Sequence, residues 1–202
     1  MAGLRSDGTM MPAAPRGGMI DRLARNWVYG GFLAGVMLFA LLPLLAGAIS
    51  WALLLTIAQL PLYMLHQFEE HDADRFRRFV NAQIGHGQEV LSPRAVCVIN
   101  IGGVWAVDVV AIWLAATAGI GFGLIAIYGV LVNAVVHIAA GLVLRRYNPG
   151  LVTSIVLFLP VGGAALWDVQ QTGQATPLQH AIGLGAALLI HAAIIAWVRR
   201  PR

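Results

Sequence analysis

Residues 121–144 read GFGLIAIYGVLVNAVVHIAAGLVL, a stretch of the chain without a single Asp, Glu, Lys or Arg. About 20 consecutive apolar residues are enough for a helix to cross the hydrocarbon core of a bilayer. The stretch therefore predicts a transmembrane helix, and it places Asn133 and His137 within the membrane. Because these two residues are four positions apart, they would share one face of that helix.

Five further stretches have a similar length and character, so the sequence predicts six transmembrane helices. Their expected ranges, with the first one included, are about 27–48, 50–70, 94–118, 121–144, 149–168 and 177–198. Capping residues that precede a proline predict three of the helix starts, at Ser92-Pro93, Asn148-Pro149 and Thr176-Pro177. We expect an all-α polytopic membrane bundle that forms one domain over residues 21–202, after a mobile tail over residues 1–20.

The composition excludes several other classes of protein. Hydrophobic residues make up 59% of the 202 residues and charged residues 11%, whereas about a quarter of a soluble domain is charged. So apolar a chain is also not disordered, and its net charge of +4 does not indicate a nucleic-acid partner. Cys97 is the only cysteine in the sequence, which excludes a disulfide framework.

The basic residues predict the orientation in the membrane. All 13 are arginines, and they fall before the first predicted span, between the second and third, between the fourth and fifth, and after the sixth. These segments all lie on one side of a six-span bundle. Because positive residues gather on the cytoplasmic side, we expect both termini to be cytoplasmic in a multi-pass protein of the bacterial inner membrane.

The end of the second span carries a cluster of ionisable residues, HQFEEH over 66–71. At 100° per residue, Glu69 lies about 60° to one side of His66 on a helix and Glu70 about 40° to the other. Both carboxylates would therefore flank one imidazole. His71 would fall about 140° away, so we do not expect it to share the site.

Other spans carry polar residues that would join this cluster. From the helical rise, the residues of the cytoplasmic-side layer lie roughly 6–11 Å below the ends of their spans. This layer and the residues that border it comprise His66, Glu69, Glu70, Tyr63, Asn100, Asn133, His137 and His191, with Asp108 nearer the middle of the membrane. Ionisable groups in membrane helices are costly and usually face the bundle interior, often at functional sites.

The motif HQFEE over 66–70 resembles the signature of the HXXEE domain family of bacterial integral membrane proteins. The family also has a second histidine and a Tyr-x-Pro-Gly motif, which correspond here to His137 and to the sequence YNPG over 147–150. The resemblance implies that these residues act together. It implies little about activity, because the family is largely uncharacterised.

The first functional hypothesis is a membrane-embedded, metal-dependent enzyme, a hydrolase or an oxidase. Imidazole and carboxylate ligands suit Zn or non-haem Fe. The expected ligands are His66, Glu70 and His137, with His191 as a spare ligand. Glu69 would be the general base, and the supporting or catalytic groups would be Tyr63, Asn100, Asn133 and Asp108. The substrate would be a membrane lipid or another hydrophobic molecule.

Two other classes of function remain open on the sequence. A metal-free acid/base isomerase or cyclase would act on an isoprenoid-like lipid, with Trp105 and Trp113 lining an apolar pocket. A proton-coupled transporter or an accessory membrane subunit would not be an enzyme. The transporter hypothesis is weaker, because the sequence shows no convincing internal repeat and the polar layer is not at the membrane centre. The sequence does not predict an oligomeric state.

Overall fold

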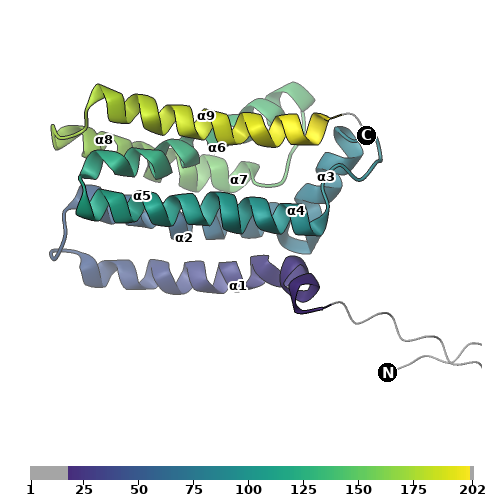
Figure 1. The fold of residues 1–202 in the computed structure, drawn as a ribbon, viewed down its shortest axis with the longest axis horizontal. Helices are drawn as coiled ribbons and strands as arrows, with labels where there is room; N and C mark the ends of the chain where they lie inside the picture. Colours follow the sequence, from purple (N-terminus) through teal and green to yellow (C-terminus); the bar gives the residue numbers. More distant parts are fainter. Residues whose placement is uncertain (1–17, 201–202) are drawn as a thin grey trace, which may run out of the picture.

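A computed structural model describes residues 18–200 of the chain. Within this range the structure contains helices and no β-strand. The long helices lie side by side with their axes in roughly the same direction, α1 at one edge of the bundle and α9 at the opposite edge (Figure 1). The predicted all-α fold is confirmed. Residues 1–17 of the predicted tail (1–20) lie outside the described residues, and its last two residues, Met19 and Ile20, already belong to α1.

The helices follow the predicted spans closely, although several spans consist of more than one segment. The longer helices are α1 (Met19–Leu41), α2 (Trp51–His71), α5 (Ala106–Thr117), α6 (Leu124–Leu144) and α9 (Pro177–Arg199). The shorter helices are α3 (Arg75–Gln83), α4 (Pro93–Cys97), α7 (Leu151–Thr153) and α8 (Gly163–Gln171). Single turns of 3₁₀-helix cover η1 (Leu42–Leu45), η2 (Asp72–Asp74) and η4 (Ile120–Gly123).

Five helical stretches are long and apolar enough to cross a membrane. They are Met19–Leu45, Pro93–Thr117, Ile120–Leu144, Leu151–Gln171 and Pro177–Arg199. The helix α2, predicted as the second of six spans, has 21 residues but is not among these five. Its polar residues, which include Gln59, His66 and Gln67, lower its hydropathy. The sixth span and the orientation therefore stay predictions.

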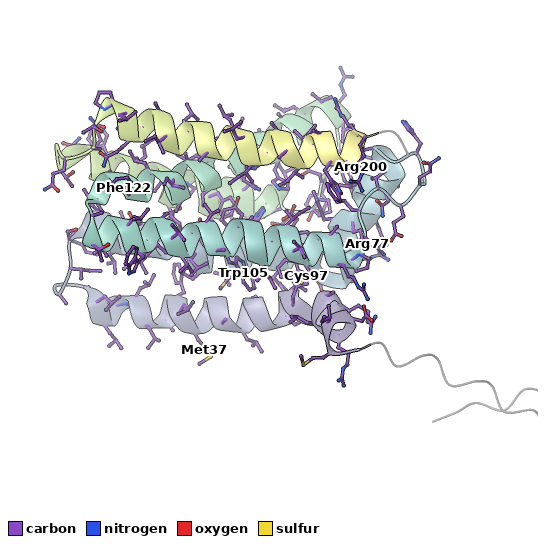
Figure 2. All side chains as sticks on the ribbon, viewed as in Figure 1. Met37, Arg77, Cys97, Trp105, Phe122 and Arg200 are labelled. Carbon is purple, nitrogen blue, oxygen red and sulfur yellow. The ribbon has the colours of Figure 1, made fainter. Side chains whose placement is uncertain are left out.

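The polar helix α2 is covered by its neighbours. It packs against α1, α5, α6 and α8, and Gln59, His66 and Gln67 are fully buried. By contrast, the outer helices expose apolar side chains, such as Met37 on α1, which points away from the bundle (Figure 2). This distribution places the polar side chains inside the bundle and an apolar surface outside, the arrangement that a lipid environment requires.

The arginines of the described residues gather at one end of the bundle. They lie at the start of α1, in α3 and α4, and at the ends of α6 and α9, which meet at the same end in Figure 1. Arg77 and Arg200 mark this end in Figure 2. We call it the arginine end. The predicted segregation of the basic residues to one side is therefore present in the fold.

Two of the three predicted caps are present. The hydroxyl of Ser92 accepts a hydrogen bond from the Ala95 N–H, and Thr176 forms a capping box with Gln179. The third prediction is wrong, because α7 begins at Leu151 after Gly150 and has no side-chain cap. The side chain of Asn148 binds His137 instead, as described below.

Two stretches form π-helix in place of regular α-helix. The first, η3 (Val98–Trp105), joins α4 to α5, and the second, η5 (Ser154–Gly162), joins α7 to α8. Pro160 lies inside η5 and lacks the N–H that a regular helical turn would use. Wide turns of this kind are frequent at functional sites, and both stretches border the centre of the bundle.

A glycine sets the close approach of α6 and α9. A Cβ atom added at Gly183 would lie 2.8 Å from the backbone oxygen of Leu124, the first residue of α6. Two residues further along α9, a Cβ at Gly185 would meet no atom within 4 Å. The two helices therefore pack backbone to backbone at Gly183, as small residues allow in membrane bundles.

We predict opposite effects for alanine at these two glycines. Gly183→Ala should destabilise the protein by about 1–3 kcal/mol, because the added methyl forces the two backbones apart. Gly185→Ala should be neutral or stabilise the protein by up to about 1 kcal/mol, because alanine is the better helix former. Thermal unfolding in detergent measures both. Equal melting temperatures for the two variants would contradict the close packing.

Candidate metal centre

Three buried residues from two helices meet near the arginine end. His66 and Glu70 come from the last two turns of α2 and His137 from α6. One potential ligand atom of each residue lies within 4.8 Å of those of the other two. The distance from His66 Nε2 to Glu70 Oε2 is 3.5 Å, and that from His137 Nε2 to Glu70 Oε1 is 3.6 Å. We call these three residues the His/Glu cluster.

The neighbours of His66 fix which of its ring nitrogens carries the proton. Its Nδ1 lies 2.8 Å from the Oγ1 of Thr153. That hydroxyl donates its own proton to a carboxylate oxygen of Glu69, so it accepts the hydrogen bond from His66 Nδ1–H. The Nε2 of His66 therefore has an unprotonated lone pair, and this fully buried atom has no hydrogen-bond partner among the described residues.

His137 is held in the same tautomer by a different residue. Its Nδ1 lies 2.7 Å from the side-chain oxygen of Asn148, and the amide nitrogen of Asn148 donates to the backbone oxygen of His137 at 2.9 Å. Because the amide nitrogen is engaged by a carbonyl, the oxygen faces the imidazole and accepts from its Nδ1–H. The lone pair of His137 Nε2 is thus also directed at Glu70.

The cluster brings together lone pairs without a proton between them. The two imidazole Nε2 atoms and the two oxygens of an ionised Glu70 are all acceptors. Neighbouring ligands of a tetrahedral site with bonds of about 2.0–2.1 Å are about 3.3 Å apart, close to the separations of 3.5 and 3.6 Å seen here. A divalent metal ion fits this donor set, since a cation would satisfy all of these atoms at once.

A glycine lies directly against both imidazoles. Gly150 precedes α7 with a φ of +97°, a backbone conformation that favours glycine. A Cβ atom there would lie 2.7 Å from the Cε1 of His137 and 2.8 Å from that of His66. The glycine is therefore required twice, by its backbone conformation and by the space that the two rings occupy.

Glu69 ties the segment 147–153 to the end of α2. One carboxylate oxygen accepts from the Tyr147 hydroxyl at 2.9 Å and from the Val152 N–H at 3.1 Å. The other accepts from the N–H of Thr153 at 2.7 Å and from its hydroxyl. Burial raises the pKa of Tyr147, and its hydrogen bond to Glu69 raises that pKa as well, so the phenol stays a donor. With four donors on its two oxygens, Glu69 is a structural anchor and not the free general base that the sequence suggested.

His71 lies closer to the cluster than the helical geometry predicted. Its Nε2 is 3.1 Å from Glu70 Oε2, so the prediction that it does not share the site is wrong. The reason is that the imidazole turns back toward Glu70, the residue before it, while its ring packs on Trp27 of α1 at 5.2 Å between centroids. The Phe76 ring lies beside it, 5.4 Å from His71 and 6.3 Å from His137.

Asn100 belongs to a separate hydrogen-bond network. Its side-chain oxygen accepts from the amide of Gln67 at 2.8 Å, and its own amide donates to the Val96 backbone oxygen. The other amide atom of Gln67 accepts from the indole N–H of Trp105 at 2.5 Å. This network joins α2 to η3, so Asn100 serves helix packing and does not contact the His/Glu cluster.

Three other predicted residues line a small cavity away from the His/Glu cluster. Tyr63, Asp108 and His191 line this cavity of about 20 Å³, which is large enough for one water molecule. Its link to the His/Glu cluster is Tyr63, whose ring lies 6.0 Å from that of His66. The Nδ1–H of His191 donates to the Ala187 backbone oxygen at 2.8 Å, and His191 is not one of the three grouped residues. The grouped residues are therefore three, His66, Glu70 and His137, and not the larger set that the sequence predicted.

Two buried oxygens in this region have no hydrogen bond within residues 18–200. They are Asp108 Oδ2 and Asn133 Oδ1. Neither residue is part of the His/Glu cluster.

Sequence reasoning missed the residues that orient the ligands. Thr153 was not a candidate at all, and Asn148 was noted only as a predicted helix cap and as the variable position of the Tyr-x-Pro-Gly motif. The available signal was the motif itself, because a glycine and a proline next to hydrogen-bonding side chains are typical of a shaped loop. Gln67 was also missed, although a polar residue inside an apolar helix usually has a partner across the helix interface.

The fold and this site define an all-helical chain with membrane-type helices and a buried His/Glu cluster. A family model described as "Protein of unknown function with HXXEE motif" matches residues 57–165, which is more than half of the chain. The protein therefore belongs to the HXXEE family. No curated protein and no solved structure matches the chain.

We predict that Gly150→Ala lowers the unfolding free energy by more than the unfavourable backbone conformation of alanine alone would. Gly173 also has a positive φ, of +66°, but a Cβ there would meet no atom within 4 Å. Both alanine variants should lose about 1–2 kcal/mol of unfolding free energy from the left-handed backbone. Gly150→Ala should lose about 1–3 kcal/mol more, because the methyl displaces both imidazoles. Unfolding melts compare the two, and equal losses would refute the contact.

The assigned tautomers predict a specific effect of Thr153→Val. The valine removes the acceptor of His66 Nδ1–H, so the Nδ1–H form of His66 should lose its preference while His137 keeps it. An unsatisfied buried donor costs about 1–3 kcal/mol. Nitrogen-15 spectra of labelled histidine side chains report the tautomers directly. Thr172→Val, at the end of α8, is the matched control and should leave both imidazoles unchanged.

Proposed function

We propose that this protein is a membrane-embedded metalloenzyme that binds one Zn²⁺ or non-haem Fe²⁺ and acts on a lipid or another hydrophobic substrate. The observation that carries the proposal is the convergence of two unprotonated imidazole nitrogens on one buried carboxylate. His66, Glu70 and His137 are the proposed ligands. The proposed location is the bacterial inner membrane, with the arginine end on the cytoplasmic side.

The number of ligands supports a catalytic site more than a structural one. Structural zinc sites have four protein ligands, whereas catalytic sites have three and leave a position for water or substrate. The His/Glu cluster offers three. A metal bound there would supply Lewis-acid activation or a bound water with a lowered pKa. The set of two histidines and one carboxylate is also common to zinc hydrolases and non-haem iron oxygenases, so both hydrolysis and oxidation stay open.

The surrounding residues would support such a centre in three ways. Thr153 and Asn148 accept the Nδ1–H of the two histidines, which orients the rings and raises the basicity of Nε2. The ring of Phe158 packs 4.3 Å from His66 and excludes water from that side. Glu69 keeps the loop in place through Thr153. None of these four residues needs to contact the substrate.

The alternatives draw less support from the arrangement. A metal-free enzyme would need a glutamic acid as its proton donor, and Glu69 already accepts from four donors, which leaves only Glu70 for that role. Trp105 is occupied by its hydrogen bond to Gln67, and Trp113 is 64% exposed, so the aromatic pocket proposed for a cationic intermediate does not form from these two. The small cavity lined by Asp108 is too small to make a continuous transport path.

Metal content tests the proposal directly. We expect the full chain, purified in detergent, to contain about one Zn or Fe per molecule by elemental analysis. His66→Ala, His137→Ala and Glu70→Gln should each lose the metal, since each removes one ligand of three. Asn148→Ala should weaken binding by 10- to 100-fold, because it frees the His137 ring.

Two controls separate this result from a general loss of binding. His191→Ala removes a half-buried histidine outside the cluster, and His86→Ala an exposed one in the loop after α3; both variants should keep the metal. A protein that binds no Zn or Fe, or that keeps them in the His66→Ala His137→Ala double variant, would overturn the proposal. If metal binds, comparative lipid analysis of cells that express the wild type or Glu70→Gln would then identify the substrate.

A further inference from the structure

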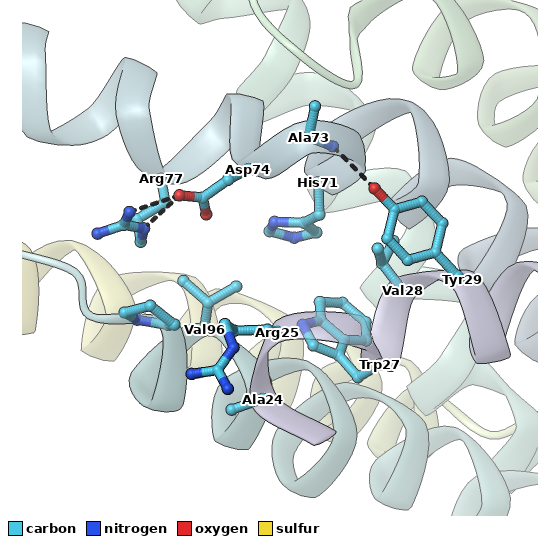
Figure 3. A pocket seen from close by; sticks show the side chains of 11 residues that line it. Ala24, Arg25, Trp27, Val28, Tyr29, His71, Ala73, Asp74, Arg77 and Val96 are labelled. Atoms are coloured by element: carbon cyan, nitrogen blue, oxygen red, sulfur yellow. Dashed lines mark hydrogen bonds and ion pairs between the residues drawn. The ribbon is translucent and has the colours of Figure 1, made fainter. Parts of the chain in front are cut away.

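A second feature of the arginine end is a cavity of about 280 Å³ between α1, the α2–α3 junction and α4. The residues that line it include Arg25, Trp27, Tyr29, His71, Asp74 and Arg77. Figure 3 shows Arg25 and Trp27 on one side and His71, Asp74 and Arg77 on the other. Small-molecule sites have volumes of about 300–1,000 Å³. The cavity lies just below this range, so we expect it to hold a small polar group and not a large ligand.

One cation of the cavity, Arg25, forms no ion pair within residues 18–200, although its charge acts on Asp21 at longer range. Arg77 is paired with Asp74 and with Glu89, at 2.5 and 2.7 Å. Arg25 makes no hydrogen bond or ion pair with any residue in the described part of the chain. The acid nearest to it in sequence, Asp21, is bound by two guanidinium nitrogens of Arg94, at 2.9 and 2.6 Å. The guanidinium of Arg25 is therefore available for an anion.

The polar lining offers donors to a ligand. Arg25, the indole of Trp27 and the imidazole of His71 all line the cavity and all carry N–H groups. The carboxylate that lines it, that of Asp74, already accepts from Arg77 Nε at 2.7 Å. A phosphate group suits this lining better than a carboxylate, because it presents more oxygens to separate donors.

The backbone next to the cavity is strained. Ala73 and Asp74 have φ values of +49° and +63°, which are uncommon for residues other than glycine. The strained turn is held by Tyr29, whose hydroxyl donates to Asp72 at 3.2 Å and accepts from the Ala73 N–H at 3.4 Å. This turn gives α3 its direction and keeps His71 and Arg77 in the wall of the cavity. Such strain is concentrated at ligand sites.

The wall of the cavity is also the wall of the His/Glu cluster. His71 lines the cavity, and its Nε2 lies 3.1 Å from Glu70 Oε2. A ligand bound at Arg25 would therefore be separated from Glu70 by one imidazole ring. We propose that this cavity binds the phosphate group of an anionic amphiphile and holds it next to the His/Glu cluster. That the amphiphile is a substrate rests on the function proposed above; the binding itself does not.

Two sources of phosphate fit the cavity, and the surroundings bear on the choice. The volume admits a headgroup but not acyl chains. The outer face of α1 beside the cavity is apolar, with Leu23 56% and Ile20 69% exposed. A lipid could therefore place its headgroup in the cavity and its chains along α1, whereas free phosphate would use the cavity alone.

Binding to the metal-free full chain tests this proposal. Protein purified in detergent and treated with a chelator is titrated calorimetrically with dihexanoyl phosphatidic acid, with dihexanoylglycerol and with inorganic phosphate. We expect the phosphatidic acid to bind at least about tenfold more tightly than the uncharged glycerol, since charge-assisted hydrogen bonds contribute this much. Arg25→Gln should abolish the preference. Arg22→Gln is the matched control, because Arg22 lies one turn away on α1 and does not line the cavity.

The outcomes distinguish the ligands and the two proposals. Tight binding of inorganic phosphate alone would overturn the amphiphile as the ligand, and binding of phosphatidic acid alone supports a lipid headgroup. No preference for the phosphorylated ligand, or an equal loss in Arg22→Gln, overturns the site. Because the titration uses metal-free protein, it succeeds even if the chain proves to bind no metal. Metal content should in turn be unchanged in Arg25→Gln, whose melting temperature confirms folding.

Discussion

The arrangement of the site depends on the hydrogen bonds that Glu69 accepts from the segment 147–153. Four donors from three residues, Tyr147, Val152 and Thr153, converge on its two oxygens. The contact joins parts of the chain that are 78 to 84 residues apart. It fixes Thr153 beside His66 and, through the same loop, Asn148 beside His137. The histidines can adopt one tautomer and one orientation only because this loop is docked on the end of α2.

The two adjacent glutamates of the HXXEE motif therefore have different partners. Glu70 faces the interior of the bundle, where it meets both imidazoles. Glu69 faces the loop and accepts only from it. One helical position corresponds to a rotation of about 100°. That rotation directs Glu70, a candidate metal ligand, toward the histidines and Glu69 toward the segment 147–153. Adjacent identical residues in a motif need not have the same role.

Much of the fold follows from hydropathy along the chain. The predicted ranges 50–70 and 177–198 correspond to Trp51–His71 and Pro177–Arg199, because a long apolar run with a polar end specifies its own length. The pairing of His66 with Glu70 follows from their i,i+4 spacing. The sequence periodicity does not specify loop conformations or side-chain rotamers. For this reason it could not predict the role of Glu69, the orientation of His71 or the acceptors Thr153 and Asn148. The predicted depth put His191 and Asn100 in one layer with the His/Glu cluster, but depth does not say which way a side chain points.

The π-helical stretch η3 affects everything that follows it along the same span. A turn closed by i→i+5 hydrogen bonds contains one more residue than a regular turn, and one residue corresponds to a rotation of about 100°. Asp108, three residues beyond η3, is 3% exposed, so the wide turns set its inward register. Shortening Val98–Trp105 by a single residue would rotate Asp108 and the rest of α5 about the helix axis, and a carboxyl group that now lies inside the bundle would be turned toward the hydrocarbon.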